Sequence, residues 1–109
     1  MAYDEALAER VRDLLAIRPG LTERKMFGGV AWMLDGNMAC GVAGDELLVR
    51  VPAEDHERAL AEDHTRVFDM TGRPMKGFVC VTPAGVADDE ALASWVDVGA
   101  GYAAGLPPK

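Results

Sequence analysis

The sequence has few of the side chains that usually carry catalysis. It contains only two histidines, His56 and His64. A catalytic nucleophile needs a neighbouring base, but both histidines stand among acidic residues, a pattern typical of a solvated acidic face. They are also two helical turns apart, whereas a helical metal pair has ligands one turn apart. The sequence therefore predicts no catalytic residue, no metal site and no cofactor.

Cysteine and long apolar runs are equally scarce. Cys40 and Cys80 are far apart and form no CxxC pattern, which argues against a zinc knuckle or a redox motif. No apolar run approaches the roughly 18 residues of a membrane span, and the acidic N-terminus lacks the regions of a signal peptide. We therefore expect a cytoplasmic protein whose two thiols are reduced and serve as small apolar strand residues.

Basic residues are outnumbered, with 11 Lys and Arg against 18 Asp and Glu and a net charge of −7. Such a field repels a phosphate backbone, so we expect neither direct nucleic-acid binding nor a membrane partner. The chain has 109 residues, half of them hydrophobic, which fits one globular domain spanning 1–109. Composition favours a protein partner over a substrate.

The pattern of apolar residues and turn signals predicts three helices and five strands. Acidic residues at the expected helix starts, near Asp4 and Asp88, suit the helix dipole. Gly99 lies in the apolar stripe of the last helix, where close backbone packing can compensate for its cost. The order α-β-β-β-α-β-β-α predicts the α+β class, a two-layer α/β sandwich with an antiparallel sheet. The predicted elements are helix 4–18, strands 26–34, 38–42 and 46–51, helix 52–63, strands 66–69 and 77–81, and a final helix from 88 to about 106.

The first predicted strand is apolar on both faces. Met33 lies on one face with Phe27 and Ala31, and the other face carries Met26, Val30, Trp32 and Leu34. Either helices cover both sides of the strand, or its open face meets a second subunit. Three short helices cover two faces poorly, so the sequence favours a homodimer.

Glycine and cationic residues suggest where a partner binds. Gly28 and Gly29 lie within the predicted strand, which indicates a bulge or a close backbone approach rather than a phosphate loop. The predicted loop 70–77 is either a solvated loop or an adaptable Met-rich surface for an acidic or apolar partner. An alternative function is a small anionic-ligand-binding domain or weak enzyme using Arg24, Arg73 and Lys76. The candidate interaction residues are Arg24, Lys25, Met26, Phe27, Gly28, Gly29, Met33, Arg73, Met75 and Lys76.

Three segments resemble the N-terminal domain of the TfoX/Sxy family, and the resemblance covers nearly the whole chain. They are 24–31 (RKMFGGVA), 75–79 (MKGFV) and 95–107, which begins Trp95-Val96 and ends Leu106-Pro107. The resemblance implies the α-β(3)-α-β(2)-α layout of the secretion-chaperone-like class.

The family's namesakes are bacterial regulators of natural competence that act with the cyclic-AMP receptor protein, which implies a partner in the transcription machinery. Those regulators carry a second, C-terminal domain, whereas this sequence ends at Lys109. We therefore expect a stand-alone single-domain member, and any role of the second domain is in doubt. The resemblance supplies no catalytic residues. The leading hypothesis is a non-enzymatic protein-interaction or regulatory module that acts as a dimer.

Overall fold

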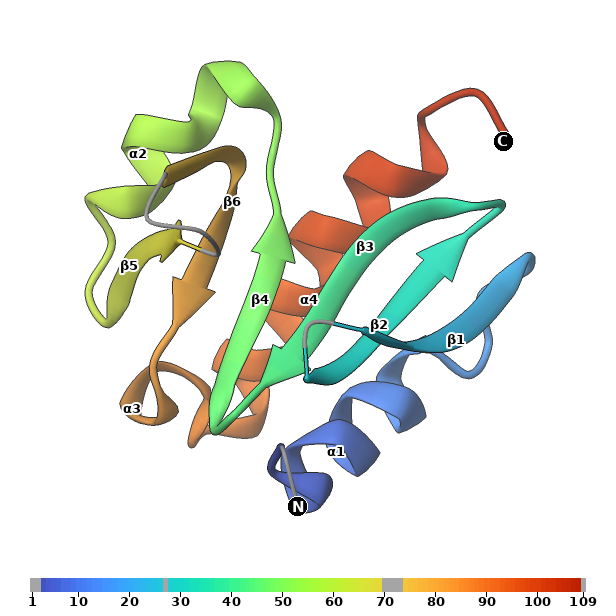
Figure 1. The fold of residues 1–109 in the computed structure, drawn as a ribbon, viewed down its shortest axis with the longest axis horizontal. Coiled ribbons are helices and arrows are strands. Elements are labelled where there is room, and N and C mark those ends of the chain that lie inside the picture. Colours follow the sequence, from blue (N-terminus) through green and yellow to red (C-terminus); the bar gives the residue numbers. More distant parts are fainter. Residues whose placement is uncertain (1–2, 27, 70–73, 109) are drawn as a thin grey trace.

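One six-stranded antiparallel sheet organises the chain (Figure 1). The computed structural model describes residues 3–26, 28–69 and 74–108. Its strands have the order β1-β2-β3-β4-β6-β5, so β6 is inserted between β4 and β5. The elements are α1 (Glu5–Leu15), β1 (Leu21–Met26), β2 (Gly29–Leu34), β3 (Asn37–Ala43), β4 (Glu46–Arg50), the 3-10 turn η1 (Ala53–Asp55), α2 (His56–Leu60), β5 (Thr65–Asp69), β6 (Pro74–Val81), α3 (Pro83–Val86) and α4 (Asp89–Ala104).

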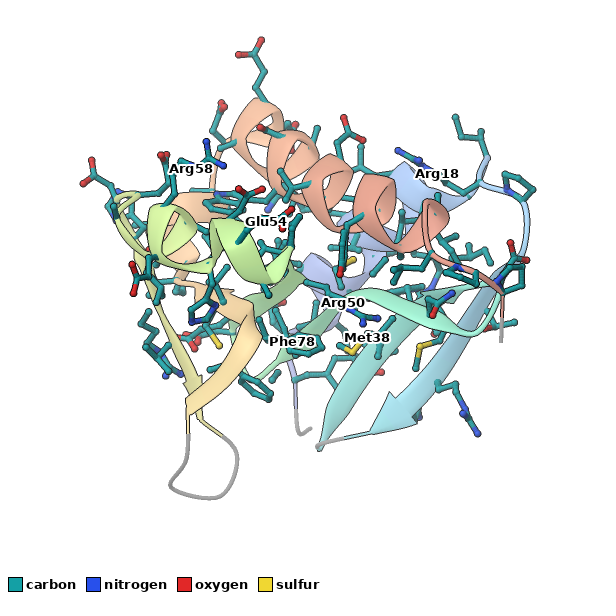
Figure 2. All side chains as sticks on the ribbon, turned by 90° about the horizontal axis from the view of Figure 1, so that it is seen from above. Arg18, Met38, Arg50, Glu54, Arg58 and Phe78 are labelled. Atoms are coloured by element: carbon teal, nitrogen blue, oxygen red, sulfur yellow. The ribbon has the colours of Figure 1, made fainter. Side chains whose placement is uncertain are left out.

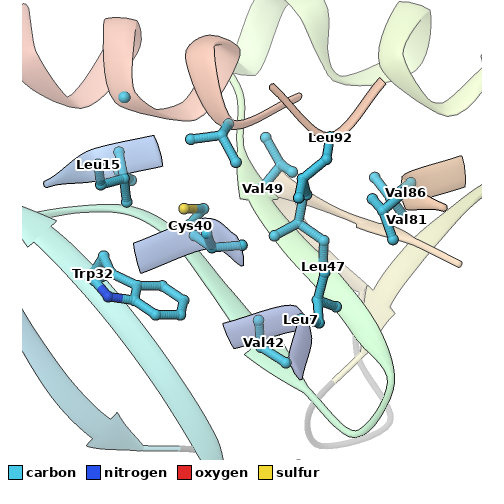
Figure 3. Packing of buried hydrophobic residues seen from close by; sticks show 14 of the residues in the cluster. Leu7, Leu15, Trp32, Cys40, Val42, Leu47, Val49, Val81, Val86 and Leu92 are labelled. Carbon is cyan, nitrogen blue, oxygen red and sulfur yellow. The ribbon is translucent and has the colours of Figure 1, made fainter. Parts of the chain in front are cut away.

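The helices of the described chain pack on one face of the sheet. The main core lies between these helices and the sheet. It contains inward-facing residues of β2, β3, β4 and β6 together with residues of α1, α3 and α4. Figure 3 shows Trp32, Cys40 and Leu47 in this layer, with Leu15 and Leu92 from the helices above them. The predicted α+β class and its antiparallel sheet are confirmed.

The ends of the two longest helices follow the predicted acidic pattern. The Asp4 carboxylate accepts a hydrogen bond from the backbone N–H of Leu7 at 3.1 Å. The Asp88 carboxylate likewise accepts from the N–H of Ala91 at 3.2 Å. Each aspartate therefore caps an otherwise unpaired backbone donor in the first turn of its helix.

The predicted strand 26–34 is confirmed only over residues 29–34, which form β2, whereas Met26 belongs to β1. Met26 ends β1, Gly28 lies in the turn with a φ of +72°, and Gly29 begins β2. Glycine adopts such a φ with little strain, and the chain turns there from β1 into β2. The predicted close backbone approach is confirmed at Gly29, where an added Cβ would lie 2.0 Å from the carbonyl oxygen of Val42.

Several element bounds also differ from the prediction. The predicted helix 52–63 is shorter, since α2 ends at Leu60 and the chain leaves the helical region by His64, whose φ is +65°. Strand β6 begins at Pro74 rather than Gly77, and the short helix α3 was not predicted. The remaining residues of the predicted loop, 70–73, lie outside the described residues. No helix in the described ranges is long and apolar enough to cross a membrane.

His56 is a further correction. The sequence placed it on a solvated acidic face, but its side chain is buried. Its Nδ1 accepts a hydrogen bond from the backbone N–H of Gly77 at 3.1 Å. Gly77 has a φ of +93°, so this bond satisfies a backbone donor at an irregular point of β6. His56 is therefore a structural link between α2 and the sheet.

Candidate interaction surface

A second apolar cluster lies on the face of the sheet that the helices leave uncovered. Figure 2 shows two of its side chains, Met38 and Phe78, on the side of the sheet away from the helical layer. Six of the seven side chains are no more than 8% exposed. We call this surface the open face. It consists of Ala31, Met33, Met38, Leu48, Phe68, Phe78 and Cys80.

The open face follows from the two-residue period of the strands. In β4, Leu47 and Val49 belong to the main core, while Leu48 between them belongs to the open face. Leu48 pairs directly with Cys80 of β6, and residues opposite each other in a ladder share a face. The same rule joins Met33 to Met38 across β2 and β3. One continuous apolar surface therefore crosses five of the six strands.

Aromatic rings and an arginine border one part of the open face. The rings of Phe68 and Phe78 are in tilted contact, with their centroids 6.2 Å apart. The guanidinium carbon of Arg50 lies 5.9 Å from the centroid of Phe78 and 5.4 Å from that of Tyr102. Two cation–π contacts thus hold the Arg50 cation between the open face and the end of α4 (Figure 2).

An ion pair borders the face at the β5 edge. Arg66 donates from Nε to Oε2 of Glu46 at 3.0 Å, and this hydrogen bond raises the pKa of Arg66 above its ordinary value. Cys80 lies beside them, and burial raises the pKa of its thiol to about 11. A thiol with that pKa is protonated at neutral pH, so Cys80 acts there as an apolar group and not as a nucleophile.

The structure separates the two predicted cations of the first hairpin. Arg24 pairs with Ala31 and therefore lies on the open face. Lys25 pairs with Val30, a main-core residue, so its side chain points to the helical side of β1. Both side chains are exposed. Arg24 and Lys25 therefore do not form one basic site together.

The other predicted interaction residues have different positions in the structure. Met33 lies on the open face, as its predicted orientation required. Gly28 and Gly29 shape the β1–β2 turn and offer no side chain. Phe27 and Arg73 lie outside the described residues. Met26, Met75 and Lys76 are placed only as backbone positions in β1 and β6. Of the three residues of the predicted anion site, Arg24 is the one whose side chain is described.

Most of the open face could not be predicted from the sequence. Its period-two signal was present in 46–51, where Leu48 and Arg50 alternate with core residues. The alternation does not say which strand lies beside β4, and its neighbour β6 is about thirty residues away along the chain. The pairing that brings Leu48, Cys80 and Phe68 together is therefore visible only in the fold.

The model of the TfoX N-terminal domain matches residues 13–103, which include every strand of the sheet and most of α4. No curated protein matches the chain.

Proposed function

The chain belongs to the TfoX N-terminal domain family, and from this premise we propose that it is a non-enzymatic regulatory module that works through its open face. One observation carries the proposal. Seven apolar side chains form a continuous surface on the face of the sheet that no described helix covers. An antiparallel sheet in a two-layer fold usually has a polar outer face, so an apolar cluster on that face supports a contact there.

The occupant that we propose for this face is a second copy of the chain. A twofold interface brings the same patch of two subunits together, so the patch must complement itself. The open face has an apolar centre and carries both charge signs at one edge, in Glu46 and Arg66. Two copies can therefore bring their apolar clusters together while the opposite charges remain available to pair across the rim.

The first test places a charge on the open face. Met33→Glu should weaken self-association at least about tenfold, which corresponds to about 1.4 kcal/mol, because a carboxylate would have to be buried in an apolar contact. Sedimentation equilibrium measures the effect. The matched control is Ile17→Glu, since Ile17 is 91% exposed between α1 and β1. A wild-type chain that stays monomeric at micromolar concentration contradicts the proposed dimer.

A second measurement covers the case in which Met33→Glu does not fold. On dilution of the wild-type chain, amide resonances of Leu48, Cys80 and Ala31 should shift, because the dimer separates at these residues. Resonances of α1 should stay in place. Shifts confined to α1, or spread evenly over the chain, contradict an interface on the open face.

The regulatory part of the proposal rests on the family. Its namesakes regulate competence together with the cyclic-AMP receptor protein, and we propose a protein partner in the transcription machinery for this chain as well. A binding assay with the purified receptor protein tests that partner. Binding to the wild type and to Ile17→Glu alike is expected, and absence of binding removes this partner while leaving the dimer proposal standing.

A further inference from the structure

A groove runs between α2 and α4 on the opposite side of the molecule from the open face. Its walls come from the end of β4 through α2 on one side and from α4 on the other, and it has a volume of about 430 Å³. Figure 2 shows α2 beside the first half of α4, with Arg58 on the side of α2 nearest to it. This size is within the range of ligand-binding pockets.

The two walls have the same spacing. Positions 55, 58, 59 and 62 line one side, and positions 91, 94, 95 and 98 line the other. Both sets have the spacing i, i+3, i+4, i+7; the second lies wholly in α4, whereas the first begins in η1, passes through α2 and ends in the turn after it. Helical walls satisfy their own backbone groups and offer no strand edge to an extended peptide. An occupant that also satisfies its own backbone, namely a helix, fits such a groove. The α4 wall is about 10 Å long, enough for about two turns of that helix.

The groove has an apolar part. Trp95 is half-buried and packs against the main core with part of its side chain. Val98 lies one turn further along α4 and is 41% exposed, one of three large apolar side chains that remain exposed in the described chain. Apolar side chains of a partner that contacted both would remove this surface from water.

The charges around the apolar part are mainly negative. Asp55 forms an ion pair with Arg58 across one turn of the α2 wall. Glu62 lines the same wall and has no ion pair within the described ranges. Exposed acids flank both walls, with Glu54 and Glu57 on one side and Glu90 on the other. A partner with positive charge beside its apolar side chains complements this arrangement.

We propose that the groove between α2 and α4 binds a basic amphipathic helix of a partner protein. Apolar side chains of that helix contact Trp95 and Val98, and its lysine or arginine side chains lie toward Glu62. This site is in the helical layer, so it does not depend on the open face or on dimerisation.

The test uses the whole chain labelled with ¹⁵N and a synthetic helical peptide made of leucine and lysine. A second peptide has glutamate in place of every lysine. The lysine peptide should shift the indole N–H resonance of Trp95. The indole N–H of Trp32 donates to Glu23 of the edge strand β1 at 2.9 Å. Its resonance serves as an internal reference and should not shift. Equal binding of the glutamate peptide overturns the proposal.

Two pairs of variants locate the binding. Glu62→Lys should weaken binding of the lysine peptide at least about tenfold. Glu9→Lys makes an equal charge change at an exposed position of α1 and should weaken this binding less than about threefold. Val98→Ser should also weaken binding of the lysine peptide. Ile17→Ser, which likewise replaces an exposed apolar side chain, should not. If Glu62→Lys and Glu9→Lys have equal effects, the peptide recognises overall charge and the groove is not its site.

A small amine distinguishes a helix from a simple cation. Benzylamine carries an aromatic ring and one positive charge, so it can occupy the space beside Trp95 without being a helix. Under our proposal it does not displace the peptide at a concentration a hundredfold above that of the peptide. Displacement at equal concentration identifies the groove as a small-cation site and overturns the helix as its occupant.

Discussion

Two glycines of α4 have opposite environments although only one residue separates them. A Cβ added at Gly99 would lie 2.2 Å from the carbonyl oxygen of Ala39, so α4 packs against the backbone of β3 there. A Cβ added at Gly101 would meet nothing within 4 Å. Close packing therefore compensates for the helix-weakening effect of Gly99, as the sequence predicted, and nothing compensates at Gly101.

This difference predicts opposite effects of the same substitution. Gly99→Ala should lower the free energy of unfolding by about 1–3 kcal/mol, because α4 must move away from β3. Gly101→Ala should raise it by up to about 1 kcal/mol, because alanine favours the helix more than glycine does. Urea unfolding of the two variants and the wild type measures both effects. Equal changes in the two variants would show that α4 does not press on β3 at Gly99.

Glu23 connects three elements through one carboxylate. Its Oε1 accepts from Nε of Arg12 at 2.8 Å and from the indole N–H of Trp32 at 2.9 Å. Its Oε2 accepts from Nη2 of Arg12 at 3.0 Å. The hydrogen bonds from Arg12, followed by that from Trp32, hold the pKa of Glu23 below its ordinary value, although burial opposes them. The ionised carboxylate therefore ties α1 and β1 to the core tryptophan.

The lowered pKa makes this contribution to stability depend on pH. It is present above the pKa of an unfolded glutamate, about 4.3, and is lost as the pH falls through the lower folded value. Glu23→Gln should reduce the free energy of unfolding by about 0.5–1 kcal/mol at pH 7, a range that allows for solvent screening of this half-exposed pair. At pH 2.5 the variant and wild type should have nearly equal stability.

The control for Glu23→Gln is Asp13→Asn, an exposed acid on α1 that forms no ion pair within the described chain. Its effect at pH 7 should be within about 0.5 kcal/mol. Chemical unfolding at pH 7 and pH 2.5, monitored by circular dichroism, measures the stability of the wild type and both variants. A Glu23→Gln deficit that persists unchanged at pH 2.5 would show that the carboxylate's charge is not what stabilises the contact.

At the scale of elements, β1 is the strand that the sequence did not reveal. Its sequence LTERKM has three adjacent charged residues, Glu23, Arg24 and Lys25, which weaken an apolar alternation. β1 is an edge strand, and charged side chains are common on edges because they oppose pairing with other chains. The same charges favour association through the open face rather than through this edge. One feature did indicate β1, because the indole N–H of a buried tryptophan needs an acceptor. For Trp32 that acceptor is Glu23 of β1.

The other elements were predictable to different degrees for physical reasons. Turns with strong local chemistry, such as Asp35-Gly36 with φ values of +52° and +86°, mark the β2–β3 hairpin from sequence alone. The long helices follow from their caps and apolar stripes. Features that depend on distant contacts could not be predicted in this way. They include the early end of α2 and the insertion of β6 beside β4. Of the open face, the sequence accordingly predicted only the shared orientation of Ala31 and Met33 in β2.

At the scale of the whole molecule, the two proposed surfaces differ in charge. The groove side is acidic at Asp55, Glu62 and their neighbours. The open face is apolar, and the charges beside it are Arg24 and Arg50 together with the Glu46–Arg66 pair. The chain as a whole has a net charge of −7, so two approaching copies repel each other at long range while a basic peptide is attracted.

Salt should therefore act in opposite directions on the two surfaces. Raising the ionic strength from about 0.05 M to about 0.5 M shortens the Debye length from well over 10 Å to less than 5 Å. Self-association should then strengthen, because repulsion between like-charged copies is screened while burial of the apolar open face remains. Binding of the lysine peptide should weaken at least about tenfold, because its attraction to the acidic groove is screened. Sedimentation and peptide titration at both salt concentrations measure the two responses. If salt strengthened or weakened both self-association and peptide binding, the same kind of force would govern both surfaces. That result would contradict an apolar open face and an acidic groove as separate binding surfaces.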